Sequence, residues 1–186
     1  TLAELATNYR WDQQTAETAL FAVVGCPVGH SMSPAMHNAA FAAADVDGLY
    51  VPLEVEDEPG AMAAVIRAIS ARPWLRWRGL SVTIPHKLST LAALGDAHCD
   101  ALAVKIGAAN TVTFDAGEAR GDNTDYAGAA ESLLAATGWS RGELAKKQIA
   151  VVGSGGVARA VVAAMTAAGA MVTIYNRTLA TAESLA

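Results

Sequence analysis

The segment Ile149–Val162, "IAVVGSGGVARAVV", constrains the fold of this chain more than any other part of the sequence. An apolar run of strand length turns through glycines into an alanine-rich stretch of helical character. Gly153, Gly155 and Ala158 match the pattern G-x-G-x-x-[G/A], whose small residues permit a tight turn and a close approach to a pyrophosphate. Glycines occur in many strand-to-helix turns, but a second apolar run, "MVTIY", follows here. The segment therefore predicts a strand–helix–strand unit that binds a dinucleotide.

The end of the second predicted strand carries the residues that would select the cofactor. Asn176, Arg177 and Thr178 stand where NAD-binding folds carry an acid for the ribose hydroxyls. Arg177 favours NADP, because a guanidinium group pairs well with the 2′-phosphate. The alternative is an arginine that is merely solvated at a strand end.

Strand-like and helix-like segments alternate before the glycine motif. Short apolar runs predict strands at residues 20–25, 49–55 and 79–84. Helical patterns cover residues 33–44 and 57–71, a stretch starting at Pro85, residues 97–105 and residues 124–137. Ser33 is predicted as the N-cap of the first of these helices, with Pro34 in its first position. The segment "NTVTFDAGEARGDN" predicts a hairpin, so the fold class is α/β with a mixed sheet.

Composition and charge exclude several classes of function. The net charge is −5 and no lysine or arginine run occurs, which argues against nucleic acid and anionic membranes as partners. No apolar stretch is long enough for a transmembrane helix. Two cysteines and four histidines without metal-ligand spacing predict neither a disulfide framework nor a metal site. We therefore expect a cytoplasmic protein that acts on a small molecule.

Polar residues that could hold a ligand occur in three places. Ser31 and Ser33 lie in a glycine-bounded loop after the first strand, and Thr83 and Lys87 stand near the C-terminal end of a buried strand, the edge where open α/β sheets bind ligands. Asn110 and Asp125 flank the predicted hairpin. Each has a structural alternative: a serine or aspartate can cap a helix, an asparagine can close a turn, and a lysine is usually solvated.

Taken together, five motifs resemble the shikimate dehydrogenase family in order and approximate spacing. They are "GCPVGHSMSPAMHNAAF", "GLSVTIPHK", "IGAANTV", "GDNTDYAG" and "VVGSGGVARAV…YNRT". The resemblance implies that substrate carboxylate and hydroxyls are held by Ser31, Ser33, Thr83, Asn110 and Asp125. It implies that Lys87 and Asp125 form the catalytic pair. It also implies that NADP is bound by Gly153, Ser154, Gly155, Gly156, Val157, Ala158, Asn176, Arg177 and Thr178.

The resemblance further implies a function and a division into domains. The expected activity is NADP-dependent reduction of 3-dehydroshikimate to shikimate. The alternatives are an NAD-dependent quinate/shikimate dehydrogenase and a non-catalytic shikimate-binding module. We expect an extension or linker at residues 1–19, an α/β substrate-binding domain at 20–126, a connecting helix and linker at 127–147, and the start of a Rossmann-like NADP-binding domain at 148–186. The start resembles the junction of bifunctional dehydroquinate dehydratase–shikimate dehydrogenases, and we expect the chain to be truncated at its C-terminus.

Overall fold

The computed structural model describes residue 6 and residues 9–186, so part of the expected extension, residues 1–5, 7 and 8, lies outside the described residues. A five-stranded sheet has the order β2-β1-β3-β4-β5. Its strands are β1 (Ala19–Gly25), β2 (Gly48–Glu54), β3 (Trp77–Val82), β4 (Thr111–Asp115) and β5 (Glu118–Asp122). β1 pairs in parallel with β2 and β3, whereas β4 is antiparallel to both β3 and β5. The predicted mixed sheet is confirmed.

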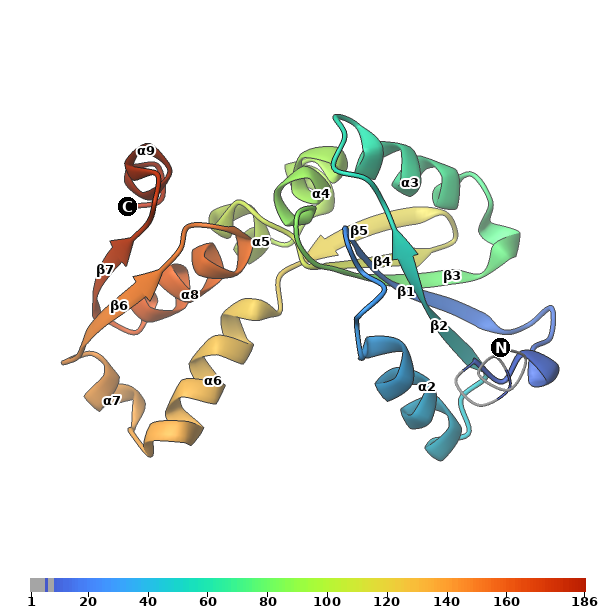
Figure 1. Ribbon diagram of the computed structural model, residues 1–186, viewed down its shortest axis with the longest axis horizontal. Coiled ribbons are helices and arrows are strands. Elements are labelled where there is room, and N and C mark those ends of the chain that lie inside the picture. The colour runs from blue at the N-terminus through green and yellow to red at the C-terminus, as the bar shows by residue number, and fades with distance from the viewer. Residues whose placement is uncertain (1–5, 7–8) are drawn as a thin grey trace.

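Helices cover both faces of this sheet (Figure 1). On one face, α3 (Ala61–Ser70) buries Met62, Ile66 and Ile69 against alternate strand residues such as Leu80 and Val112. On the other face, α2 (Ser33–Ala43) packs Phe41 against Phe21 of β1. Every second residue of a strand, and every third or fourth residue of the helix, is apolar and faces the same interior. These apolar faces pack together and form the core. The described residues also include three short 3-10 helices: η1 (Trp11–Gln13), η2 (Pro73–Leu75) and η3 (Asp96–His98).

The chain then forms a second, smaller unit. It contains α6 (Asp125–Thr137), α7 (Arg141–Leu144), β6 (Gln148–Val152), α8 (Gly156–Ala167), β7 (Met171–Tyr175) and α9 (Leu179–Glu183). β6 and β7 are parallel, so the predicted strand–helix–strand unit is present. α6 packs against α8, where Ala130, Ala164 and Met165 share one apolar cluster with Leu144. We call residues 19–122 the N-terminal lobe and residues 125–186 the C-terminal lobe.

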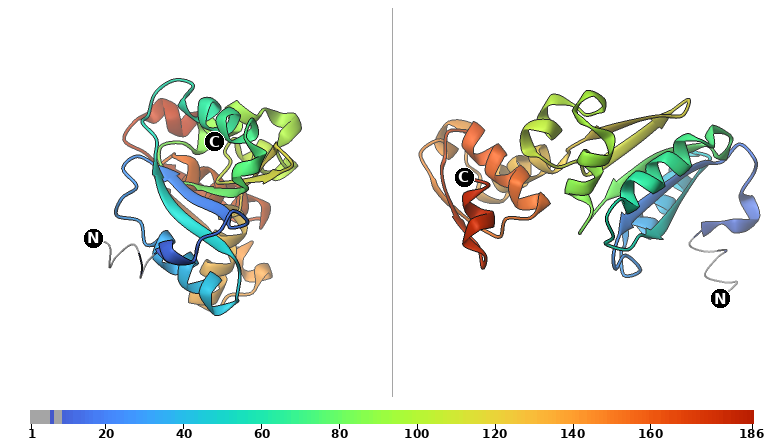
Figure 2. Two further views of the ribbon diagram at one scale, coloured as in Figure 1. Left: turned by 90° about the vertical axis from the view of Figure 1, so that its right-hand side faces the viewer. Right: turned by 90° about the horizontal axis from the view of Figure 1, so that it is seen from above.

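Two helices of the N-terminal lobe lie on the side that faces the C-terminal lobe (Figures 1 and 2). They are α4 (Lys87–Leu94) and α5 (Ala101–Ile106). Ile106 and Ala108 form a small buried cluster with Ala160 of α8, which joins the lobes through apolar contact. The boundary predicted near residue 126 falls inside α6, the helix that packs on α8. The domain division itself stays a prediction. No helix in the described part of the chain has the length and apolar content needed to cross a bilayer.

Several predicted boundaries are wrong, each for a local reason. Ser33 is not the N-cap of α2: Met32 holds that position, and the Ser33 amide donates to the Ser31 hydroxyl at 3.2 Å. The helix predicted from residue 57 begins only at Ala61, because Gly60, at φ 83°, has a left-handed backbone conformation that does not fit a regular helix. The third strand ends at Val82 and its following helix starts at Lys87, two residues after Pro85.

Two further segments differ from the predictions. The single helix expected at 97–105 is split into η3 and α5, because Asp100 is extended and accepts a hydrogen bond from the Ala103 amide as the N-cap of α5. The polar linker contains α7, which starts with a capping box. Ser140 and Glu143 each accept a hydrogen bond from the backbone amide of the other. The backbone amide and the hydroxyl of Ser140 both donate to the Glu143 carboxylate, and these hydrogen bonds lower the pKa of Glu143.

We expect the core under α3 to dominate the stability of the N-terminal lobe. Leu80 is 1% exposed in the main cluster, so Leu80→Ala should lower the free energy of unfolding by about 2–5 kcal/mol. Leu75→Ala removes the same atoms at a site that is 43% exposed and should cost less than half as much. Urea unfolding followed by circular dichroism measures both; equal losses would contradict this description of the core.

Candidate active site

One edge of the five-stranded sheet collects all the predicted substrate residues. β1, β3 and β5 end at this edge and β4 begins there, as the strand pairings require. Ser31 and Ser33 follow β1, and Thr83 and Lys87 follow β3. Asn110 precedes β4, and Asp125 follows β5. The topology thus brings together residues that lie up to 94 positions apart in the sequence.

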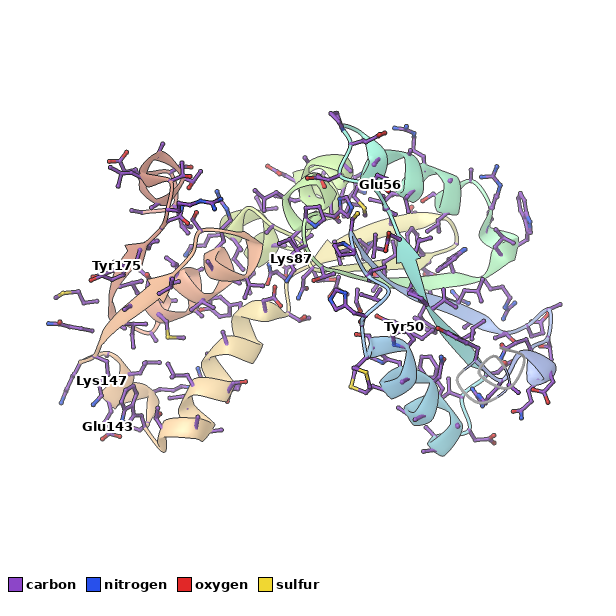
Figure 3. The ribbon with its side chains drawn as sticks, viewed as in Figure 1. Tyr50, Glu56, Lys87, Glu143, Lys147 and Tyr175 are labelled. Carbon is purple, nitrogen blue, oxygen red and sulfur yellow. The ribbon has the colours of Figure 1, made fainter. Side chains whose placement is uncertain are left out.

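Lys87 and Asp125 form an ion pair at this edge. Lys87 Nζ donates to Asp125 Oδ2 at 2.6 Å, and the two side chains are only 10% and 22% exposed. Each is the first residue of its helix, Lys87 of α4 and Asp125 of α6. The helix N-terminus favours the carboxylate and disfavours the ammonium, so the contact with Asp125 offsets an unfavourable position of Lys87. Figure 3 shows Lys87 between the two lobes.

The turn before α4 fixes where Lys87 begins its helix. The Thr83 amide donates to the carbonyl of Val24 at 2.8 Å, and the His86 amide donates to the carbonyl of Thr83 at 2.9 Å. His86 is 1% exposed, and its Nε2–H donates to the carbonyl of Val55 at 2.6 Å. His86 was not among the predicted site residues. Its position inside the motif "SVTIPHK", directly before Lys87, was the one sequence signal for it.

A second set of hydrogen bonds fixes Asp125. Asn110 Oδ1 accepts from the Thr124 amide, and Asn110 Nδ2 donates to the Thr124 hydroxyl, both at 2.9 Å. Asn123 Oδ1 accepts from the Asp125 amide at 3.1 Å, while Asn123 Nδ2 donates to the carbonyl of Ala108 at 2.8 Å. Asn110 therefore supports the turn that carries Asp125. Asn123 does the same and was missed, because nothing in its local sequence distinguishes it from an ordinary turn residue.

A cavity of about 240 Å³ lies beside the two serines. It is lined by Val23, Pro27, Val28, His30, Ser31, Ser33, Ser81, Val82, Thr83 and Ile84. The Ser31 oxygen accepts from the Ser33 amide, which leaves the Ser31 O–H free to donate to another group. Hydroxyl donors around a small concave site suit an oxygen-rich, negatively charged ligand.

A larger cavity of about 530 Å³ lies between the two lobes. It is lined by Thr83, Ile84, Pro85, Lys87, Leu88, Val152, Gly153, Gly155, Gly156, Val157 and Ala158. Thr83 and Ile84 line both cavities, so the serine cavity and the glycine loop adjoin each other. Lys87 faces the second cavity next to the start of α8.

The glycine loop fits the phosphates of a dinucleotide. Gly153 has φ 112°, a conformation that favours glycine. A Cβ on Gly153 or Gly155 would meet no atom within 4 Å, so the loop is open on that side. The first amides of α8 have no acceptor within the helix, and the helix dipole is positive there. These features together make the loop suitable for a pyrophosphate.

The residues after β7 are tied to the same loop. Ser154 Oγ donates to Thr181 Oγ1 at 3.1 Å, and the Asn176 side-chain amide donates to the carbonyl of Thr178 at 2.7 Å. Arg177 is exposed and makes no ion pair with a residue that the structure describes. Thr181 was missed by the sequence reasoning, because it lies beyond the motif and its hydroxyl reaches back only in the folded chain.

One group of possible metal ligands occurs away from Lys87. Cys26, Glu54 and Glu56 bring ligand atoms within 4.8 Å of one another. Partial desolvation and the nearby charge of Glu56 raise the pKa of the Cys26 thiol, which disfavours the thiolate that metals bind. The expectation of no metal site stays a prediction.

Comparison with known proteins gives consistent matches in both lobes. The family model described as shikimate dehydrogenase substrate binding domain matches residues 23–112, and that described as shikimate / quinate 5-dehydrogenase matches residues 134–186. The shikimate dehydrogenase (NADP(+)) of Methanocella arvoryzae is 46% identical over 167 residues, which are 90% of this chain and 57% of the relative. The chain thus spans little more than half the length of that relative.

Solved structures agree. A crystal structure of a shikimate dehydrogenase in complex with NADP+ has a TM-score of 0.81 and 37% identity, covering 94% of this chain and 56% of that one. The Thermus thermophilus enzyme in complex with NADP(H) and shikimate has a TM-score of 0.73 and 34% identity, covering 90% and 59%. Because both lobes match in sequence and in structure, this chain belongs to the shikimate dehydrogenase family.

Proposed function

We propose that a protein containing this chain reduces 3-dehydroshikimate to shikimate with NADPH. The observation that carries the proposal is the Lys87–Asp125 pair: Lys87 lines the cavity beside the glycine loop, and that cavity shares Thr83 and Ile84 with the serine cavity. A substrate held by the serines would present its ring to Lys87. The matched relatives named shikimate dehydrogenase (NADP(+)) support the same activity.

The chain's own residues supply the proton side of this reduction. The nicotinamide, when bound, supplies hydride to the carbonyl carbon of the substrate. Negative charge then develops on the carbonyl oxygen, and the Lys87 ammonium stabilises it and gives up a proton to form the hydroxyl. Asp125 holds the ammonium in place at 2.6 Å and has a second carboxylate oxygen available for a substrate hydroxyl.

The serine cavity is proposed to hold the carboxylate end of the substrate. The Ser31 and Ser33 hydroxyls are the donors next to Thr83, at the common boundary of the two cavities. Asn110 keeps one amide hydrogen beyond its bond to Thr124, which suits a contact with a ring hydroxyl.

Cofactor choice is proposed to depend on Arg177. The guanidinium is exposed beside the loop that Ser154 and Asn176 join through Thr181, so it can pair with a 2′-phosphate. We also propose a cytoplasmic location; both cysteines are free thiols, as a reducing compartment requires.

Removal of the ammonium should mainly slow the chemical step. In a protein of the relatives' length that contains this chain, Lys87→Ala should lower kcat by about 100-fold or more, the usual loss for an acid–base group. Lys105→Ala, which removes an exposed lysine of α5, is the matched control and should leave kcat unchanged. NADPH oxidation with 3-dehydroshikimate measures both. Near-normal turnover of Lys87→Ala would remove this lysine from the mechanism.

Removal of Arg177 should change cofactor selectivity and leave folding intact. Charge-assisted hydrogen bonds contribute about 1.5–3 kcal/mol each, so Arg177→Ala should weaken NADPH binding by about 10- to 100-fold. NADH lacks the 2′-phosphate and should bind as before, which makes it the internal control. Titrations of both cofactors give the ratio. An unchanged ratio would favour an NAD-dependent quinate/shikimate dehydrogenase instead.

A further inference from the structure

Gly156, the first residue of α8, lies directly against the side chain of Lys87. A Cβ built on Gly156 would stand 2.9 Å from Lys87 Cβ, 3.0 Å from its Cδ and 3.4 Å from its Cγ. The other glycines of the loop, Gly153 and Gly155, have open space at the same position. Among the loop glycines, Gly156 is therefore the one at which the space for a side chain is occupied by another residue, Lys87.

The backbone conformation does not explain a glycine at this position. Gly156 is absent from the residues with positive φ and begins a regular helix, so any residue could adopt its conformation. Glycine is also a poor helix former, by about 1 kcal/mol relative to alanine in a helix interior. Space, and not flexibility, is what the glycine provides here.

Lys87 cannot simply move away from a larger residue. Its carbonyl accepts a hydrogen bond from the Ala109 amide at 2.9 Å, and its ammonium is held by Asp125 at 2.6 Å. The residue is only 8% exposed. The nearest atom is Cβ, which is rigidly attached to the backbone, so a methyl group on Gly156 must displace the start of α4 or of α8.

We propose that Gly156 is a positioning residue for Lys87. Its lack of a side chain lets the start of α8 press against the lysine stem and direct the ammonium toward Asp125. The C-terminal lobe thereby orients a group that belongs to the N-terminal lobe. The importance of this contact for catalysis rests on the proposed function. The contact is distinct from an approach of the loop to the phosphates, for which Gly153 and Gly155 leave open space.

Shikimate binding without cofactor separates these two roles. In a protein of the relatives' length, Gly156→Ala should weaken shikimate binding by on the order of tenfold, because a displaced Lys87 loses a charge-assisted contact. Gly142→Ala is the matched control: Gly142 lies in α7, away from both cavities, has no positive φ and leaves open space for a methyl group, so shikimate affinity should stay unchanged. Calorimetric titration measures both. Equal affinities of the two variants for shikimate would overturn the proposal.

A stability cycle tests the same contact without any ligand. Lys87→Gly removes all three atoms that a methyl on Gly156 would meet. Gly156→Ala should therefore lower the thermal midpoint, or prevent folding, in the presence of Lys87 and have no such effect in the Lys87→Gly background. The same loss in both backgrounds would overturn the proposal. If the unaltered protein binds no shikimate, the proposed function fails, whereas this cycle still tests the contact between Gly156 and Lys87.

Discussion

The contact between Lys87 and Asp125 is the interaction on which the arrangement of this molecule depends. Two largely buried charges are costly to remove from water, and each is tolerable only because the other lies within hydrogen-bond distance. The pair joins the first turn of α4 to the first turn of α6, helices that belong to different lobes. The distance between the two charged groups therefore depends on how the two lobes are placed relative to each other.

The surrounding hydrogen bonds are arranged to hold both ends of this pair. His86 anchors the start of α4 to the backbone after β2, and Asn110 and Asn123 hold the start of α6 against the segment before β4. A third surface is supplied by Gly156, which touches the lysine stem from α8. The ion pair and the side chains that support it thus come from the sheet edge, while the glycine loop covers the opposite side of Lys87. This arrangement leaves the lysine ammonium little freedom except toward Asp125 and the cavity.

Much of this fold follows from local patterns in the sequence. The alternating strand residues, the hairpin through Ala116 and Gly117, and the glycine turn before α8 are all short-range signals, and each is present in the structure. Errors arose where neighbouring residues compete. Ser33 and Pro34 predict a helix with Ser33 as its N-cap. Met32 is the N-cap instead, because the Ser33 amide already donates to the Ser31 hydroxyl.

The site could be predicted only in part. The alternation of strands and helices indicates that ligands bind at one sheet edge, but the pairing of Lys87 with Asp125, 38 residues apart, came from the resemblance to a family. The roles of Asn123 and Thr181 and the contact of Gly156 with Lys87 depend on distances between elements. Such distances follow from packing and are not encoded in any local pattern.

A crystal structure of a protein of the relatives' length containing this chain, with shikimate bound, tests the central claim most directly. The account predicts that the ligand lies in the serine cavity, with its carboxylate at Ser31 and Ser33. One ring hydroxyl should then lie within hydrogen-bond distance of both Lys87 Nζ and the Asp125 carboxylate. Shikimate bound elsewhere, or bound there with Lys87 directed away from every hydroxyl, would contradict the account.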